Sequence, residues 1–98
     1  MHLELPHKFT KEKAVENIKE MLTKHRAELA AHATFNEERW DNSTLYFEVD
    51  LQGKEITGTL ETTDSNYIVD AKLPLMWRMF EGKIEAEVKK QVEQMSKD

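Results

Sequence analysis

Residues 45–73 read LYFEVDLQGKEITGTLETTDSNYIVDAKL, and this stretch decides the fold. Apolar and polar side chains alternate along residues 45–51, 55–62 and 67–73, which is the pattern of strands with one buried face. Residues 52–54 and 64–66 separate these segments and have the composition of tight turns. The stretch therefore predicts three consecutive strands.

The sequence before this stretch predicts a fourth strand and a helix. Residues 2–9 alternate, and Pro6 on their polar side indicates an edge strand, because proline lacks the N–H that a sheet ladder needs. Thr10 is a suitable N-cap for a helix over residues 11–32, which carry an apolar stripe at helical spacing. Residues 34–44 are polar apart from Phe35 and Trp40, and we predict that they form the longest connection.

A second helix is predicted from Pro74 to near the C-terminus. Proline suits the first turn of a helix, and one apolar stripe follows it through Met76, Trp77, Phe80, Ile84, Val88 and Val92. Because each strand has a single apolar face, both helices are expected to cover the same side of the sheet. The predicted fold is an α+β two-layer sandwich of order β-α-β-β-β-α. It has a mainly antiparallel four-stranded sheet with two helices on one face, and residues 1–98 form one domain.

Composition and charge narrow the function classes. The chain has no cysteine, which excludes disulfides, thiol nucleophiles and thiolate metal sites. The net charge is −5, and residues 34–73 hold nine acidic against three basic side chains. This argues against nucleic acid as a partner, because clustered Lys and Arg supply most of that affinity. Residues 1–6 lack the start of a signal peptide and no apolar stretch is long enough for a membrane span, so we expect a cytoplasmic protein.

Short motifs along nearly the whole chain carry a family resemblance. They are HKFT at 7–10, Trp40, LYF at 45–47, ITGTL at 56–60, VDAKLP at 69–74 and FEGKIE at 80–85. In these motifs the chain resembles the polyhydroxyalkanoic acid system proteins, a family of small bacterial proteins named for their association with genes of polyester-storage granules. The resemblance implies a granule-related context, and it brings no catalytic residues.

The start of the second helix holds the clearest candidate site. Leu75 and Met79 lie four residues apart and well off the apolar stripe of their helix. Either Phe35 and Trp40 cover them, or residues 74–76 are not yet helical, or an exposed apolar patch meets a partner subunit, a granule surface or an acyl chain. The candidate contact residues are Leu75, Met76, Trp77, Met79 and Phe80, with Trp40 as a lid.

His7 is the second candidate. Its place on the apolar side of a strand favours a buried structural role, and a binding or acid–base role is the alternative, because histidine titrates near neutral pH. His25 and His32 lie about 10 Å apart along the predicted helix, too far to share one metal ion without a third element. We therefore predict no metal site. The polar outer face of the sheet is expected to be solvated, with docking or dimerisation as its alternative.

The sequence favours a non-catalytic accessory or interaction domain, associated by resemblance with polyhydroxyalkanoate storage granules and using no cofactor. Its expected partner is a protein or the granule surface, and a homo-oligomer is also open. The alternative is a small carrier that holds an apolar or acyl ligand between helices and sheet, although Phe47, Trp77 and Phe80 leave little room. A hydrolase is least favoured, because Ser43 and Ser65 lie in predicted turns without an oxyanion-type loop.

Overall fold

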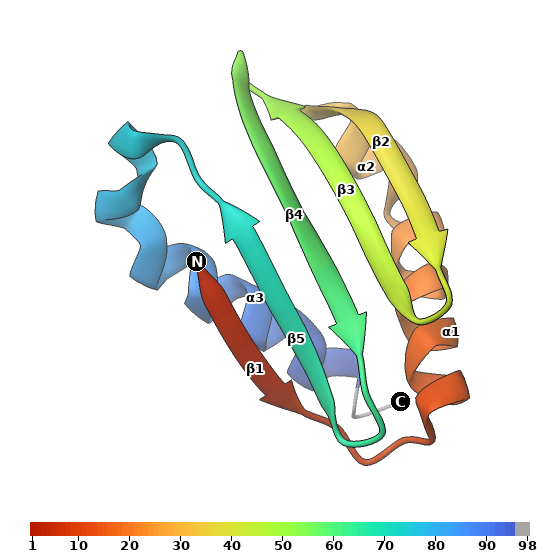
Figure 1. Cartoon of the computed structure of the whole chain (residues 1–98). Coiled ribbons are helices and arrows are strands. Elements are labelled where there is room, and N and C mark those ends of the chain that lie inside the picture. Colours follow the sequence, from red (N-terminus) through yellow and green to blue (C-terminus); the bar gives the residue numbers. More distant parts are fainter. Residues whose placement is uncertain (96–98) are drawn as a thin grey trace.

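The computed structural model describes residues 1–95, and its strands form one antiparallel sheet of five strands (Figure 1). The strands lie in the order β1-β5-β4-β3-β2, with β1 and β2 at the edges. Residues 96–98 of the predicted domain lie outside the described residues. The bounds of the strands are β1 His2–Pro6, β2 Ala33–Asp41, β3 Thr44–Leu51, β4 Lys54–Thr62 and β5 Asn66–Lys72.

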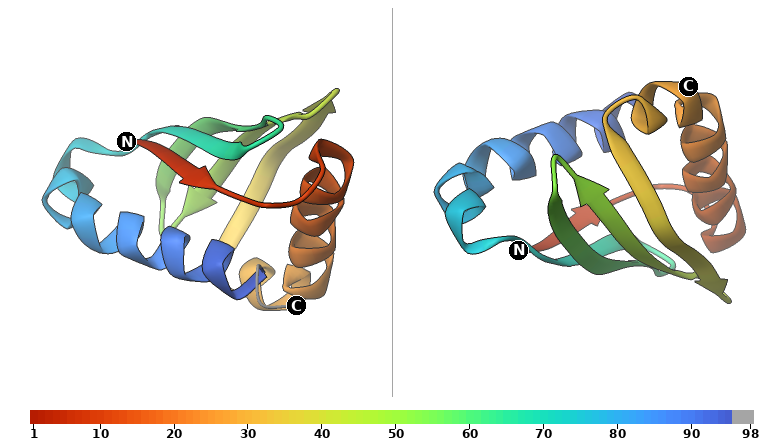
Figure 2. Two further views of the ribbon diagram at one scale, coloured as in Figure 1. Left: turned by 90° about the horizontal axis from the view of Figure 1, so that it is seen from below. Right: turned by 90° about the horizontal axis from the view of Figure 1, so that it is seen from above.

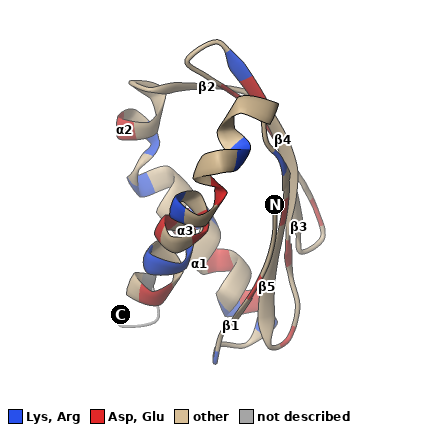
Figure 3. Cartoon of the chain, turned by 90° about the vertical axis from the view of Figure 1, so that its left-hand side faces the viewer, with Lys and Arg blue, Asp and Glu red and all other residues tan. Residues whose placement is uncertain are grey.

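Three α-helices and one 3-10 helix complete the described chain. The α-helices are α1 (Lys11–Lys24), α2 (Arg26–Ala30) and α3 (Glu81–Met95), and the 3-10 helix η1 (Leu75–Phe80) leads into α3. Figure 2 shows α1 and α3 inclined to one another on the same side of the sheet, and Figure 3 shows the sheet edge-on with the helices on that side. The α+β class and the one-sided helical layer are confirmed, with one strand and one α-helix more than predicted.

The hairpins of the central sheet form where the sequence indicates. Gln52 and Gly53 join β3 to β4 with φ angles of 54° and 78°, so both residues of this turn are left-handed. Such two-residue turns match the twist of antiparallel strands. Asn42, with φ of 56°, makes a similar tight turn between β2 and β3. These turns fix the register in which β3 and β4 present their apolar residues to the helices.

The prediction of a connection over residues 34–44 is wrong, because most of this segment is strand β2. A register shift between Phe35 and Glu37 interrupts the strict alternation that strand prediction depends on. After the shift, Glu38 pairs with Phe47 on the helix side of the sheet. Its carboxylate accepts two hydrogen bonds from the Arg26 guanidinium, at 2.9 and 3.0 Å. A charged side chain therefore occupies an inward position and is paired there by α2.

The single helix predicted over residues 11–32 is also corrected. Thr10 caps α1 as expected, since its hydroxyl accepts from the N–H of Lys13 at 3.2 Å. However, α1 ends at Lys24, and α2 starts after His25. The Thr23 hydroxyl donates to the carbonyl of Lys19 at 3.0 Å, a type of bond that bends helices. The break lets α2 lie against β2.

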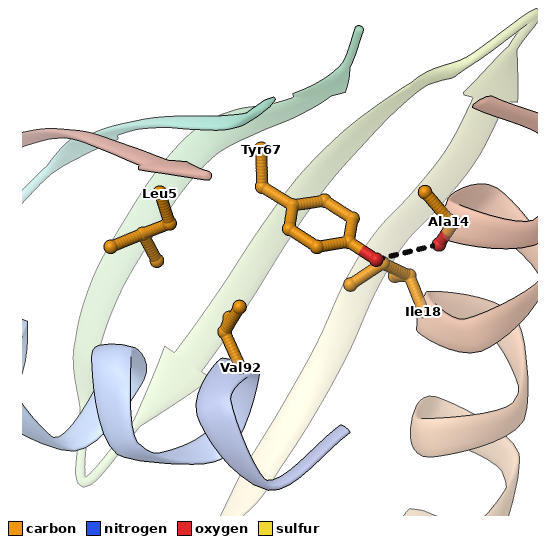
Figure 4. Packing of buried hydrophobic residues seen from close by; sticks show 5 residues of the cluster. All are labelled: Leu5, Ala14, Ile18, Tyr67 and Val92. Carbon is orange, nitrogen blue, oxygen red and sulfur yellow. Dashed lines mark hydrogen bonds between the residues drawn. The ribbon is translucent and has the colours of Figure 1, made fainter. Parts of the chain in front are cut away.

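The core lies where α1, α3 and β5 meet. Its buried residues come from β1, α1, β5 and α3, and Tyr67 at 0% exposure is at their centre (Figure 4). The Tyr67 hydroxyl donates to the carbonyl of Ala14 at 3.1 Å, which ties β5 to the first turns of α1. The cluster consists of Leu5, Ala14, Ile18, Tyr67 and Val92.

Candidate functional site

The most exposed large apolar side chains of the described chain lie on η1. Pro74 precedes η1 in an extended conformation, and its carbonyl accepts from the Trp77 N–H at 2.9 Å to start the 3-10 turn. This tight winding differs from the α-helix predicted from Leu75, and it leaves Trp77 half-buried. We call the four exposed residues the η1 patch: Leu75 (80% exposed), Met76 (60%), Met79 (81%) and Phe80 (49%).

Trp40 does not cover the η1 patch, so its predicted role as a lid is wrong. Trp40 lies on β2, at the opposite edge of the sheet from β1, whereas η1 follows β5 and projects beyond the other side of the sheet (Figure 1). The indole packs against the core cluster. The ammonium of Lys19 lies 5.0 Å from its ring centroid, which is a cation–π contact between α1 and β2. Phe35 is on the same strand and does not cover η1 either.

His7 is held by hydrogen bonds on both of its ring nitrogens. Nε2 lies 2.9 Å from the carbonyl of Thr63, and Nδ1 accepts from the backbone N–H of Phe9 at 3.2 Å. These partners fit the neutral ring that carries its hydrogen on Nε2. The ring is buried and lies 4.8 Å from the ring of Tyr67, centroid to centroid. The arrangement ties the end of β1 to the β4–β5 turn, and it supports the structural interpretation of His7.

A second apolar feature lies between the helices and the sheet, where the carrier alternative would place a ligand. It is a groove of about 550 Å³ with the sheet as its floor, α1 and α2 as one wall and α3 as the other. Aliphatic and aromatic side chains line most of it, including Leu22 and Leu29 on one wall and Val88 on the other. Phe35, Val49, Leu51 and Leu60 lie on its floor and are only half-buried.

The rim of this groove carries polar side chains from both walls. On α1 and α2, His25 Nδ1 lies 3.5 Å from a carboxylate oxygen of Glu28. On α3, the side-chain amide of Gln91 donates to Glu87 at 3.1 Å. Each wall therefore places one carboxylate at the edge of an apolar floor.

The outer face of the sheet is polar, as predicted. Arg39 stacks on Tyr46 with its guanidinium 4.3 Å from the ring centroid. At the other edge, both ring nitrogens of the exposed His2 meet carboxylates, Nδ1 at Asp70 and Nε2 at Glu4. Hydrogen bonding to Asp70, followed by that to Glu4, raises the pKa of His2 above its ordinary value of 6.5.

Replacing Asp70 by asparagine is expected to lower the pKa of His2, because it removes the largest cause of the increase. Since the pKa is raised in the folded state, the interaction stabilises the fold below about pH 6.5 and is lost as the pH rises through the raised value. An NMR titration of the four histidines measures this directly. An unchanged His2 pKa in the variant would show that Asp70 and His2 are not paired in solution.

The part of the chain that the structure describes contains neither a metal-ligand cluster nor a helix suited to span a membrane. Within residues 1–95 no group of three or more His, Cys, Asp or Glu side chains is arranged to hold a metal ion. In the same range, no helix has both the length and the apolar character needed to cross a bilayer. What the described residues offer is apolar surface: a protruding patch at η1 and a concave groove over the sheet.

The fold and these surfaces define a small α+β protein whose helices cover only one face of an antiparallel sheet. Residues 1–95 match the sequence model of the family described as "Putative polyhydroxyalkanoic acid system protein", and the chain belongs to this family. No curated protein and no solved structure is significantly similar to the chain. The family resemblance identified in the sequence motifs is thus confirmed over nearly the whole length.

Proposed function

We propose that this protein is a non-catalytic accessory of polyhydroxyalkanoate storage in the cytoplasm, and that it adheres to the apolar polyester surface of the granule through the η1 patch. The observation that carries the proposal is the exposure of Leu75 and Met79, at 80% and 81%. The family description supplies the storage context. Scattered apolar residues on a surface are ordinary, but here four of the six residues of one short helix are exposed, large and apolar.

The size of the patch favours a soft apolar surface over a second folded protein. A standard protein interface uses roughly 20–30 residues from each side. η1 has six residues, and it projects from one end of the sheet (Figure 1). A short protruding segment can enter a polymer surface that has no fixed shape, whereas it cannot by itself form a large complementary interface. Methionine side chains suit such contacts, because they are flexible and polarizable.

The energy available is consistent with reversible adhesion. Complete burial of a Leu, Met or Phe side chain contributes about 1.5–3 kcal/mol. Four side chains that are partly buried on a surface therefore supply several kcal/mol before the cost of association is deducted. Arg78, the polar residue inside η1, can keep its charge in water because long cationic side chains extend away from apolar surfaces.

The double substitution Leu75→Glu, Met79→Glu is expected to lower the fraction of protein bound to polyhydroxybutyrate particles at least about tenfold, because it replaces the two most exposed apolar side chains by charges. Co-sedimentation with the particles measures the bound fraction, and circular dichroism checks that the variant is folded. Both residues are solvent-exposed, so the fold should be retained.

A matched control places the same two charges elsewhere. Ala27→Glu, Ala31→Glu has the same spacing of four residues on an exposed surface at α2, and it should bind like the wild type. An equal loss of particle binding in both variants would show that net charge causes the effect, and it would refute adhesion through the η1 patch. Light scattering on the same proteins covers the remaining alternative: a wild-type oligomer that the η1 variant converts to a folded monomer would assign the patch to subunit association.

A further inference from the structure

The groove between the helices has the dimensions and lining of a small-molecule site. Sites for small ligands are concave, about 300–1,000 Å³ in volume, and mostly apolar with a few polar groups. The groove has about 550 Å³ and three walls from one chain: the sheet, α1 with α2, and α3. Its polar groups lie on the helices and at His25 and His32, which follow α1 and α2, while its floor from β2, β3, β4 and β5 is lined mainly by apolar side chains.

The apolar floor of the groove extends beyond the compact core. Leu5, Ala14, Ile18, Tyr67 and Val92 form the buried cluster at one end. Farther along the same face, Phe35, Val49 and Leu51 keep part of their surface open between α2 and α3. Figure 2 shows why: α1 and α3 are inclined to each other, so they cannot both follow the strands closely. The open surface is lined mainly by aliphatic side chains, which suits a flexible aliphatic chain.

The charges at the rim select among such chains. Glu28 stands on one wall, 3.5 Å from Nδ1 of His25, and Glu87 stands on the other, where it accepts a hydrogen bond from Gln91. Both carboxylates line the groove, so a negatively charged head group at the rim would meet two like charges. A neutral head group avoids that repulsion. Gln91 has two N–H groups, of which one goes to Glu87, so its amide can also donate to a carbonyl or hydroxyl oxygen.

We propose that this groove binds one neutral aliphatic chain that carries an ester or hydroxyl group, and that it discriminates against the corresponding free carboxylate. The chain lies along the floor between Leu22 and Val88, and its polar group faces the rim at Gln91. This binding is separate from granule adhesion, because none of the η1 residues lines the groove.

The test compares three probes that share one chain: 1-decanol, methyl decanoate and ionised decanoate, all below the concentration at which they aggregate. Calorimetric titration of the wild type should give saturable binding of the two neutral probes, and about tenfold weaker binding of decanoate. In the double variant Glu28→Gln, Glu87→Gln the two neutral probes should bind with the wild-type affinity. The affinity for decanoate should rise close to that of the neutral probes. Equal affinity of all three probes for the wild type would overturn the charge selection.

The second test uses variants in which a larger side chain fills the groove. Val88→Trp adds a large ring to the α3 wall at a half-buried position, and it should weaken binding of 1-decanol at least about tenfold with an unchanged circular dichroism spectrum. If that variant does not fold, Leu29→Trp fills the groove from the opposite wall. Wild-type binding that survives a folded groove-filled variant would place the ligand elsewhere and refute the proposal.

The remaining occupant is a second copy of this chain, whose η1 patch could enter the groove. Light scattering decides this in the same samples. The ligand proposal would be overturned by two results together: the wild type is an oligomer that Val88→Trp and the double variant Leu75→Glu, Met79→Glu each convert to a monomer, and neither monomer binds 1-decanol. The Leu75→Glu, Met79→Glu monomer binding 1-decanol like the wild type is the expected result. Loss of granule adhesion alone would leave the groove intact, so the two proposals fail separately.

Discussion

Substitution of Gly58 by alanine is expected to destabilise the protein by about 3 kcal/mol or more, which is a large part of the roughly 5–15 kcal/mol that stabilises a domain of this size. A Cβ at this position would overlap the carbonyl oxygen of Asp70, and it would lie 2.9 Å from the Cα of Ala71 and 2.7 Å from the Phe47 ring. The ring can shift, but the β5 backbone can move only by separating from β4. Thermal or urea unfolding measures the change.

Gly82 offers the matched control, because it receives the same methyl group in open space. No atom lies within 4 Å of a Cβ built there, and the residue is in the first turn of α3. Gly82→Ala is therefore expected to leave stability unchanged or to raise it by up to about 1 kcal/mol. A wild-type melting temperature in Gly58→Ala would mean that β4 and β5 are farther apart at this point than the structure has them.

The central strands could be predicted because their signals are local. In residues 45–73 apolar residues recur at every second position of each strand, and each break is a turn sequence, so β3, β4 and β5 follow from periodicity. β2 could not be found this way. Its alternation is interrupted at the register shift after Phe35, and the charged Glu38 lies on the helix side of the sheet, where it pairs with Arg26. That pairing depends on the break between α1 and α2 at His25, which the periodicity of the sequence does not show.

Of the two candidate sites, the η1 patch could be predicted from the sequence and the groove could not. Leu75 and Met79 are identifiable from the sequence because they depart from the stripe of their own helix, and the structure exposes both. The groove is different. Periodicity tells which residues face the sheet, but the angle between α1 and α3 decides whether those residues touch each other or leave a space. Large side chains such as Phe47 led to the expectation of a filled interior, whereas its ring lies over Gly58, away from the groove lining.

Tyr67→Ala is expected to cost about 3–5 kcal/mol of stability, the range for removing a large aromatic side chain from a core. The ring is completely buried, belongs to the core cluster together with Ile18 and Val92, and also forms part of the groove floor. Its loss should therefore leave a cavity that joins the groove to the core. Urea unfolding gives the free energy, and binding of 1-decanol to the folded fraction reports on the altered floor.

Tyr67→Phe separates the hydroxyl from the ring. It removes the hydroxyl and with it the hydrogen bond to the Ala14 carbonyl, so it should cost about 1 kcal/mol near neutral pH. A loss as large as that of Tyr67→Ala would show that the hydrogen bond, rather than the packing of the ring, holds β5 to α1.

The same pair of proteins predicts how stability changes in alkali. Burial raises the pKa of the Tyr67 hydroxyl above its ordinary value of 10.0. Above about pH 10 the unfolded chain therefore loses this proton before the folded protein does. The unfolded state then binds fewer protons, so the stability of the wild type falls as the pH rises. Tyr67→Phe lacks this group and keeps Tyr46, so the advantage of the wild type over the variant should shrink above about pH 10. A difference between the two proteins that stays constant into alkali would mean that the hydroxyl reaches water in the folded state, and that the core is open at Tyr67.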